Sequence, residues 1–157
     1  MALALESAGK VRQKTKMYGL SPAIFYILKA FFLYWATNKG NADLQFLPFS
    51  AADIVTATGY SPIGAVTSTV HVVYARNSGT GDGTDSWIVL HDASTNTDDA
   101  VVMISGVIQD DNDQFIFVNP EGSLFAADLT ISAVTAGASE TESAEANAAD
   151  GFVIVSA

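Results

Sequence analysis

The chain has 157 residues, the length of one ordinary domain. Hydrophobic residues make up 49% and charged residues 15%, so the chain can bury a core and is not intrinsically disordered. It has no cysteine, which excludes disulfides, thiolate zinc sites and cysteine nucleophiles. The formal net charge of −10 argues against nucleic acid as a partner, because an acidic surface repels phosphate.

Charge is divided unevenly along the chain. Six of the seven basic residues and one acid precede Gly40, a net charge of +5, whereas residues 40–157 hold one arginine and sixteen acids, a net charge of −15. Four of the basic residues alternate with a period of two, which is typical of an extended segment with its charges on one side. We expect an extended basic arm that contacts an acidic surface, on its own domain or on a copy in a neighbouring subunit, through Lys10, Arg12, Lys14 and Lys16.

An apolar run from Met17 to Ala36 predicts a helix over residues 22–38. Ser21 is an N-cap residue, Pro22 occupies the first helical position, and Asn38-Lys39-Gly40 supplies a stop. Apolar side chains cover nearly the whole circumference, so the helix needs burial on all sides. Because one sandwich has limited surface, we expect other protein subunits to contribute to burying Ile24, Ile27, Leu28, Phe31, Phe32 and Trp35.

The same run leaves a membrane anchor open as an alternative. About 20 apolar residues are needed to span a bilayer, and Lys29 interrupts the run at an insertion cost of roughly 3 kcal/mol. The basic residues upstream do fit a positive-inside pattern. We favour burial by protein, because Lys29 can extend its ammonium group to water while its stem packs.

The remainder of the sequence is typical of antiparallel β structure. A short helix over residues 51–58 comes first, since Ser50-Ala51-Ala52-Asp53 has the form of a capping box. Alternation of apolar with small or polar residues, rich in Val and Thr, then predicts six strands with turn signals between them. The strands are Ala65–Asn77, Trp87–His91, Val101–Ile108, Gln114–Val118, Leu129–Thr135 and Phe152–Val155, with Asn119-Pro120-Glu121-Gly122 as a turn and residues 136–150 as a solvated loop.

These elements predict a mainly β fold. We expect an antiparallel β-sandwich or jelly roll over residues 60–157. Residues 1–59 would form a basic N-terminal arm with one long and one short helix.

The sequence contains no recognisable catalytic motif. His71 and His91 are the only histidines, and each lies within a predicted strand. Gly59-Tyr60-Ser61-Pro62-Ile63 lacks the second glycine of a nucleophile elbow, and Gly79–Gly83 lacks the Lys-Ser/Thr of a phosphate-binding loop. We therefore expect no enzymatic activity, no catalytic residue and no cofactor.

Two acidic segments leave a calcium site open as an alternative. Asp82 and Asp85 lie in a glycine-rich loop, and Asp110-Asp111-Asn112-Asp113 forms an acidic turn. Carboxylate oxygens are ligands that Ca²⁺ prefers, but the EF-hand spacing of glycine and glutamate is absent. We favour solvated turn residues and expect no required metal.

Three parts of the sequence carry a resemblance to a known family, namely Asp85–Ser94, Asn119–Phe125 with Leu129–Val134, and Asp150–Val155. Asp85–Ser94 resembles the strand followed by Leu-x-Asp-Ala-Ser in small β-sandwich domains of tailed-phage virion proteins. Asn119–Phe125 with Leu129–Val134 is similar to their Gly-Leu-x-Phe-x-x-Gly-Leu-x-Val segment, and Asp150–Val155 to their last strand. The similar region covers roughly residues 66–157, and nothing in the first 60 residues matches it.

The resemblance implies a non-enzymatic virion structural protein on the capsid surface. A capsid decoration or cement protein that stabilises contacts between capsid subunits is the first expectation, and a tail or head–tail adaptor protein is the second. The implied partners are the major capsid protein or other virion proteins, with the chain itself in a homo-oligomer and without nucleic acid or membrane.

Two further classes of protein stay open beside the virion protein. One is a membrane-anchored protein with a β ectodomain, suggested by Met17–Ala36. The other is a carbohydrate-binding module or enzyme, suggested by aromatic residues on a sandwich, namely Tyr60, Tyr74 and Trp87.

Removal of divalent cations tests the expectation that the protein requires no metal. Because solvated carboxylates need no cation, EDTA is expected to leave the melting temperature of the protein unchanged, measured by circular dichroism. A clear drop in the melting temperature, restored by added Ca²⁺, would show that one of the two acidic segments holds a cation.

Overall fold

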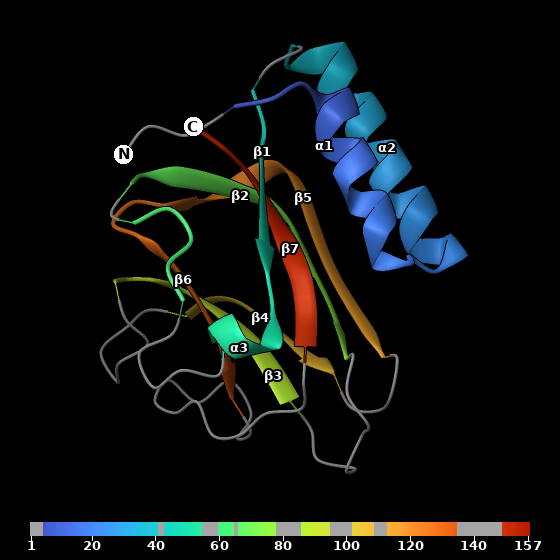
Figure 1. Ribbon diagram of the computed structural model, residues 1–157. Coiled ribbons are helices and arrows are strands. Elements are labelled where there is room, and N and C mark those ends of the chain that lie inside the picture. The colour runs from blue at the N-terminus through green and yellow to red at the C-terminus, as the bar shows by residue number, and fades with distance from the viewer. Residues whose placement is uncertain are drawn as a thin grey trace.

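The computed structural model describes residues 5–40, 43–54, 60–64, 66–77, 86–94, 102–108, 113–134 and 149–157. Three layers follow one another in space: a helical pair, a four-stranded antiparallel sheet and a three-stranded antiparallel sheet (Figure 1). The predicted mainly β class with two packed antiparallel sheets is confirmed, and the helices add a layer to it.

The long helix forms as predicted. Helix α2 spans Pro22–Asn38, and the Ser21 hydroxyl accepts a hydrogen bond from the Ile24 amide at 3.4 Å. Helix α3 (Ala51–Ile54) begins at the predicted capping box, where the Asp53 carboxylate accepts from the Ser50 amide at 2.7 Å. Residues 55–58 of the predicted short helix lie outside the described residues.

The prediction of an extended basic arm is wrong for the residues that carry the charge. Helix α1 spans Ala8–Thr15 and continues into the short 3-10 helix η1 (Lys16–Tyr18). The Ser7 hydroxyl caps α1 by accepting from the Lys10 amide at 3.4 Å. Val11 and Thr15, four residues apart, are buried on one side of α1. Burial of this side favours a helix over the extended conformation that the charge spacing predicted.

The four-stranded sheet has the order β1-β7-β2-β5. Its strands are β1 (Gln45–Phe49), β7 (Ala149–Ser156), β2 (Ser68–Asn77) and β5 (Gln114–Phe125). Strand β1 was not predicted; it carries Pro48, which lacks an amide donor and is tolerated because β1 is an edge strand. The segment before residue 60, expected to hold only the arm and helices, therefore also contributes a strand.

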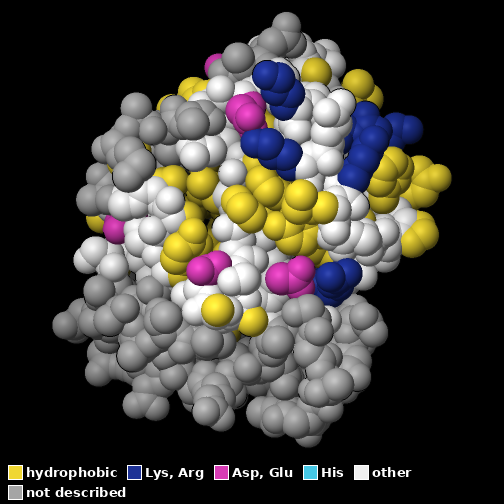
Figure 2. Space-filling view, viewed as in Figure 1, with side chains coloured by type: hydrophobic (Ala, Val, Ile, Leu, Met, Phe, Trp, Pro, Cys, Tyr) yellow, Lys and Arg dark blue, Asp and Glu magenta, His cyan; other side chains and the backbone are white. Residues whose placement is uncertain are grey.

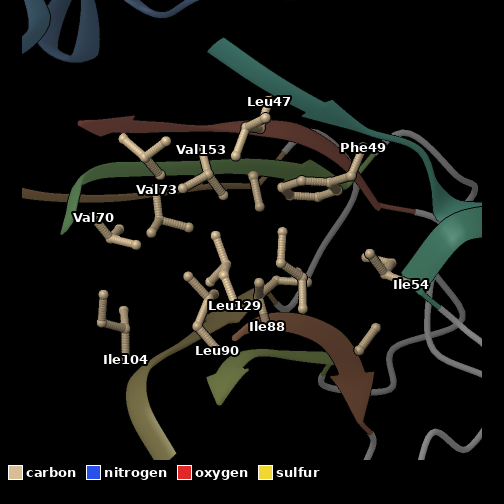
Figure 3. Packing of buried hydrophobic residues seen from close by; sticks show 14 of the residues in the cluster. Leu47, Phe49, Ile54, Val70, Val73, Ile88, Leu90, Ile104, Leu129 and Val153 are labelled. Atoms are coloured by element: carbon tan, nitrogen blue, oxygen red, sulfur yellow. The ribbon is translucent and has the colours of Figure 1, made fainter. Parts of the chain in front are cut away.

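The three-stranded sheet has the order β4-β3-β6. It consists of β4 (Val102–Ile108), β3 (Ser86–Asp92) and β6 (Leu129–Val134), close to the predicted bounds. The two sheets enclose the main core, in which valines of the four-stranded sheet face Ile and Leu side chains of the other (Figure 3). Val70, Val73, Ile88, Leu90 and Leu129 are all fully buried there.

A second core lies between the helices and the outer face of the four-stranded sheet. The Phe152 ring stacks on Tyr74 with centroids 5.1 Å apart, and Tyr18 meets Phe152 edge-on at 5.0 Å. Leu28 and Phe31 of α2 belong to the same cluster. The four-stranded sheet is therefore covered on both faces, which joins the N-terminal helices to the sandwich as one packed unit.

The second core predicts a large effect at Phe152. Phe152→Ala should lower the free energy of unfolding by about 3–5 kcal/mol, because it leaves a cavity among aromatic rings. Tyr26→Ala, at a side chain of α2 that is 66% exposed, should change it by about 0.5 kcal/mol or less. Urea titration followed by tryptophan fluorescence measures both, and equal effects would contradict the described packing.

Candidate interaction surface

The chain itself buries most of the helix residues predicted to contact other subunits. Ile24, Leu28, Phe31, Phe32 and Trp35 pack in the second core and are at most 6% exposed. The prediction that α2 depends on neighbouring subunits for their burial is wrong, because the four-stranded sheet and α1 cover this side of the helix. Only Ile27 of the predicted set is exposed, at 42%.

The opposite side of α2 is apolar and exposed. Tyr26 and Leu33 lie there, 66% and 67% exposed, Phe25 and Ile27 flank them with smaller exposed fractions, and Met17 of η1 is also open to solvent. Figure 2 shows hydrophobic side chains beside lysine and arginine over the helices, at the upper right. We call the exposed surface of the helical layer the outer helical face. It comprises Arg12, Lys16, Met17, Phe25, Tyr26, Ile27, Lys29 and Leu33, and on the other side of α1 it extends to Lys10 and Lys14.

Four of the cations on this face have no carboxylate partner within the described parts of the chain. Lys14 pairs with Glu6, whereas Lys10, Arg12, Lys16 and Lys29 make no ion pair there. The Arg12 guanidinium lies 6.0 Å from the centre of the Phe25 ring, so cationic and apolar groups are interleaved. Lys29 was not among the predicted contact residues, although a lysine within an otherwise apolar helix was a signal that this position faces solvent.

Polar contacts hold the helical layer on the sheet. The Arg76 guanidinium donates to the Tyr18 carbonyl at 3.0 Å and lies 3.5 Å from the Asp150 carboxylate. The Gln114 side-chain oxygen accepts from the Ser21 amide at 3.3 Å and from the Tyr74 hydroxyl at 3.2 Å. Both ends of the turn between η1 and α2 are therefore tied to strands.

The other end of α2 is tied to strand β5. The Tyr34 hydroxyl donates to Glu121, and Lys39 lies 3.7 Å from the same carboxylate. The hydrogen bond from Tyr34, and then the charge of Lys39, hold the pKa of Glu121 below its usual range. The outer helical face is thus presented on a layer fixed at both ends.

His71 lies at a bulge in the sheet. The pairing of β2 shifts between Val70 and Val72 against both neighbouring strands, and Asn119–Gly122 of β5 accommodates the shift opposite His71. The tetrapeptide predicted as a turn is therefore an irregularity inside β5. Gly122 is required there, since its φ is 85° and an added Cβ would lie 2.1 Å from the Thr69 methyl group.

The bulge brings together a histidine and a serine that are far apart in the sequence. The His71 Nδ1 lies 3.3 Å from the Asn119 carbonyl oxygen, and Nε2 lies 2.8 Å from the Ser156 hydroxyl. Because a carbonyl only accepts, Nδ1 carries the proton and Nε2 accepts from Ser156. A pocket of about 320 Å³ lies beside this pair, with Lys39, Asp43 and Glu121 among its lining residues.

This pair is poorly suited to nucleophilic catalysis. A catalytic histidine must become an imidazolium, which a carboxylate normally orients and stabilises. His71 is oriented by a neutral carbonyl and packs against Trp35, with ring centres 4.6 Å apart. Burial lowers the pKa of His71, so the imidazolium is disfavoured. We interpret the pair as a structural link between β2, β5 and β7.

The structure also bears on the carbohydrate platform, the calcium site and the membrane anchor. Tyr74 is fully buried, so it cannot form a carbohydrate platform with Tyr60 and Trp87. Asp82, Asp85 and Asp110–Asn112 lie outside the described residues, and the described ones contain no cluster of potential metal ligands. In the part of the chain that the structure describes, none of the helices has both the length and the apolarity needed to cross a bilayer.

The burial of His71 predicts a pH-dependent stability. Its pKa is lowered in the folded state, so below about pH 6.5 the unfolded chain binds a proton that the folded chain does not bind. Stability should therefore fall as the pH drops from 6.5 toward the folded-state pKa of His71. Lys39 and Glu121 are the charged groups that act on the ring.

The test is urea unfolding between pH 8 and pH 5, with the His71→Gln variant as control. The wild-type free energy of unfolding should decrease more steeply below pH 6.5 than that of the variant, because the variant retains every other titrating group. Parallel curves would contradict the assignment of the loss to His71.

The chain matches no family model, no curated protein and no solved structure. Among the described residues, the outer helical face is the surface that combines exposed apolar side chains with unpaired cations.

Proposed function

We propose that the protein is a non-enzymatic structural component of a tailed-phage virion, of the capsid decoration or cement type. The observation that carries the proposal is the outer helical face, where exposed aromatic and aliphatic side chains lie among cations without a described partner. The resemblance of the body to virion β-sandwich domains adds to it.

The partner is an acidic protein surface on a neighbouring shell subunit. Exposed apolar patches on soluble proteins mark interaction sites, and the cations of this face complement a negative surface. The chain has a net charge of −15 beyond residue 39, so the basic helical layer and the acidic body favour a fixed orientation on such a partner. Repetition over a shell would add avidity to contacts that are individually modest.

The direct test is quantitative mass spectrometry of purified particles encoded by the genome that carries this gene. We expect the chain in amounts comparable to the major shell protein, because a cement protein binds at every equivalent site. Its absence from purified particles would refute the proposal. Enrichment in isolated tails rather than shells would assign it to the tail instead.

Charge reversal tests the docking face. Changing Lys10, Arg12, Lys14 and Lys16 to Glu together should strongly reduce particle occupancy at physiological salt. All four are changed because single exposed ion pairs contribute only about 0–1 kcal/mol. The control is the charge-preserving variant Lys10→Arg, Lys14→Arg, Lys16→Arg, which keeps the cations of this face and should retain occupancy. An unchanged melting temperature shows that the fold is intact, and unchanged occupancy of the fourfold variant would exclude this face as the contact.

A further inference from the structure

A groove between α1 and α2 opens on the outer helical face. Its volume is about 220 Å³, and small or apolar side chains make up most of its lining, among them Ala8, Phe32 and Ala36. Arg12 and Lys29 line it as well, one from each helix. The groove therefore offers an apolar cavity between two cations.

The lining of the groove leaves room for an incoming group. Gly9 lies within α1, where glycine is an unfavourable helix residue. A Cβ added at Gly9 would meet no atom within 4 Å, so the space beside it is open. Arg12 and Lys29, in turn, make no ion pair with any described residue, which leaves both cations available to a partner.

The size of the groove favours a side chain over a free small molecule. Pockets for drug-sized ligands usually measure about 300–1,000 Å³, whereas this groove has about 220 Å³. A bilayer fits less well, because it presents a flat surface and offers no single side chain to a concave site between two helices.

We propose that the groove binds one apolar side chain of a partner protein, in a segment whose flanking carboxylates pair with Arg12 and Lys29. The inference rests on the proposed function, because it names the chemistry of the segment that docks on the outer helical face. In many protein interfaces, a few apolar side chains that fill pockets on the partner contribute most of the binding affinity.

The probe is a blocked peptide of sequence Gly-Ser-Glu-Phe-Glu-Ser-Gly, titrated into the ¹⁵N-labelled full chain and followed by NMR. The amides of Gly9 and Ala36 should shift, because they line the groove. Replacing Phe by Ser, or both Glu by Gln, should weaken binding about tenfold, a difference of about 1.4 kcal/mol.

Two variants test the groove from the protein side. Gly9→Leu fills the open space, and the double variant Arg12→Glu, Lys29→Glu reverses both cations. Each should weaken peptide binding about tenfold, the loss expected for an anchoring contact. The matched control is Lys10→Glu, Lys14→Glu, which makes the same change of charge on the other side of α1, away from the lining of the groove, and it should bind almost normally. Melting temperatures show that each variant is folded.

Several outcomes would overturn the inference. These are an absence of peptide binding, unchanged binding by Gly9→Leu, or an equal loss in the Lys10→Glu, Lys14→Glu control. Binding to phosphatidylglycerol vesicles that Gly9→Leu abolishes would assign the groove to a membrane instead, and self-association that it abolishes would assign the groove to a second copy.

Measurements of particle occupancy distinguish failure of the groove proposal from failure of the proposed function. If Gly9→Leu occupies particles normally while the fourfold charge reversal does not, the groove proposal fails and the virion assignment stands. If the wild-type chain is absent from particles but binds the peptide, the virion assignment fails and the groove chemistry stands.

Discussion

The four-stranded sheet is apolar on both of its faces, and the arrangement of the other layers depends on this. On β7, Phe152 and Ile154 belong to the helix-facing core, whereas Val153 and Val155 belong to the core between the sheets. Antiparallel sheets commonly leave one face to solvent. Here a solvated outer face would expose a row of aromatic and aliphatic side chains, so the helical layer is an integral part of the fold.

The bulge at His71 adapts β2 to this double burial. Val70 faces the second sheet, while Val72 belongs to the helix-facing core, and the intervening His71 contacts Trp35 of α2. The register shift thus places two consecutive residues on the helical side, which simple alternation does not allow. Ser156 and the Asn119 carbonyl then satisfy the polar atoms of a ring that burial would otherwise penalise.

These constraints also shape the outer helical face. Because α2 is held at Ser21 by Gln114 and at Tyr34 by Glu121, its exposed side keeps one orientation relative to the sandwich. A surface that is already ordered loses less conformational entropy on binding, which favours association through modest contacts. Because the helical layer is basic and the rest of the chain is acidic, such contacts favour one orientation of the protein on its partner.

The sequence by itself determined the features that depend on neighbours along the chain. The caps at Ser21 and Ser50, the helix over Pro22–Asn38 and the approximate bounds of β2, β3, β4 and β6 follow from local patterns, as does the split of charge. The apolar circumference of α2 also showed that the helix needs cover.

Only the tertiary structure decided which side of α2 is covered, and by what. Local patterns cannot report contacts between residues distant in sequence. The pairing of Pro48 with Phe152, which adds β1 to the sheet beside β7, and the contact of His71 with Ser156 were therefore not predictable. The conformation of Lys10–Lys16 was mispredicted for the same reason: the charge spacing suggested an extended arm, but burial of Val11 in the second core stabilises a helix.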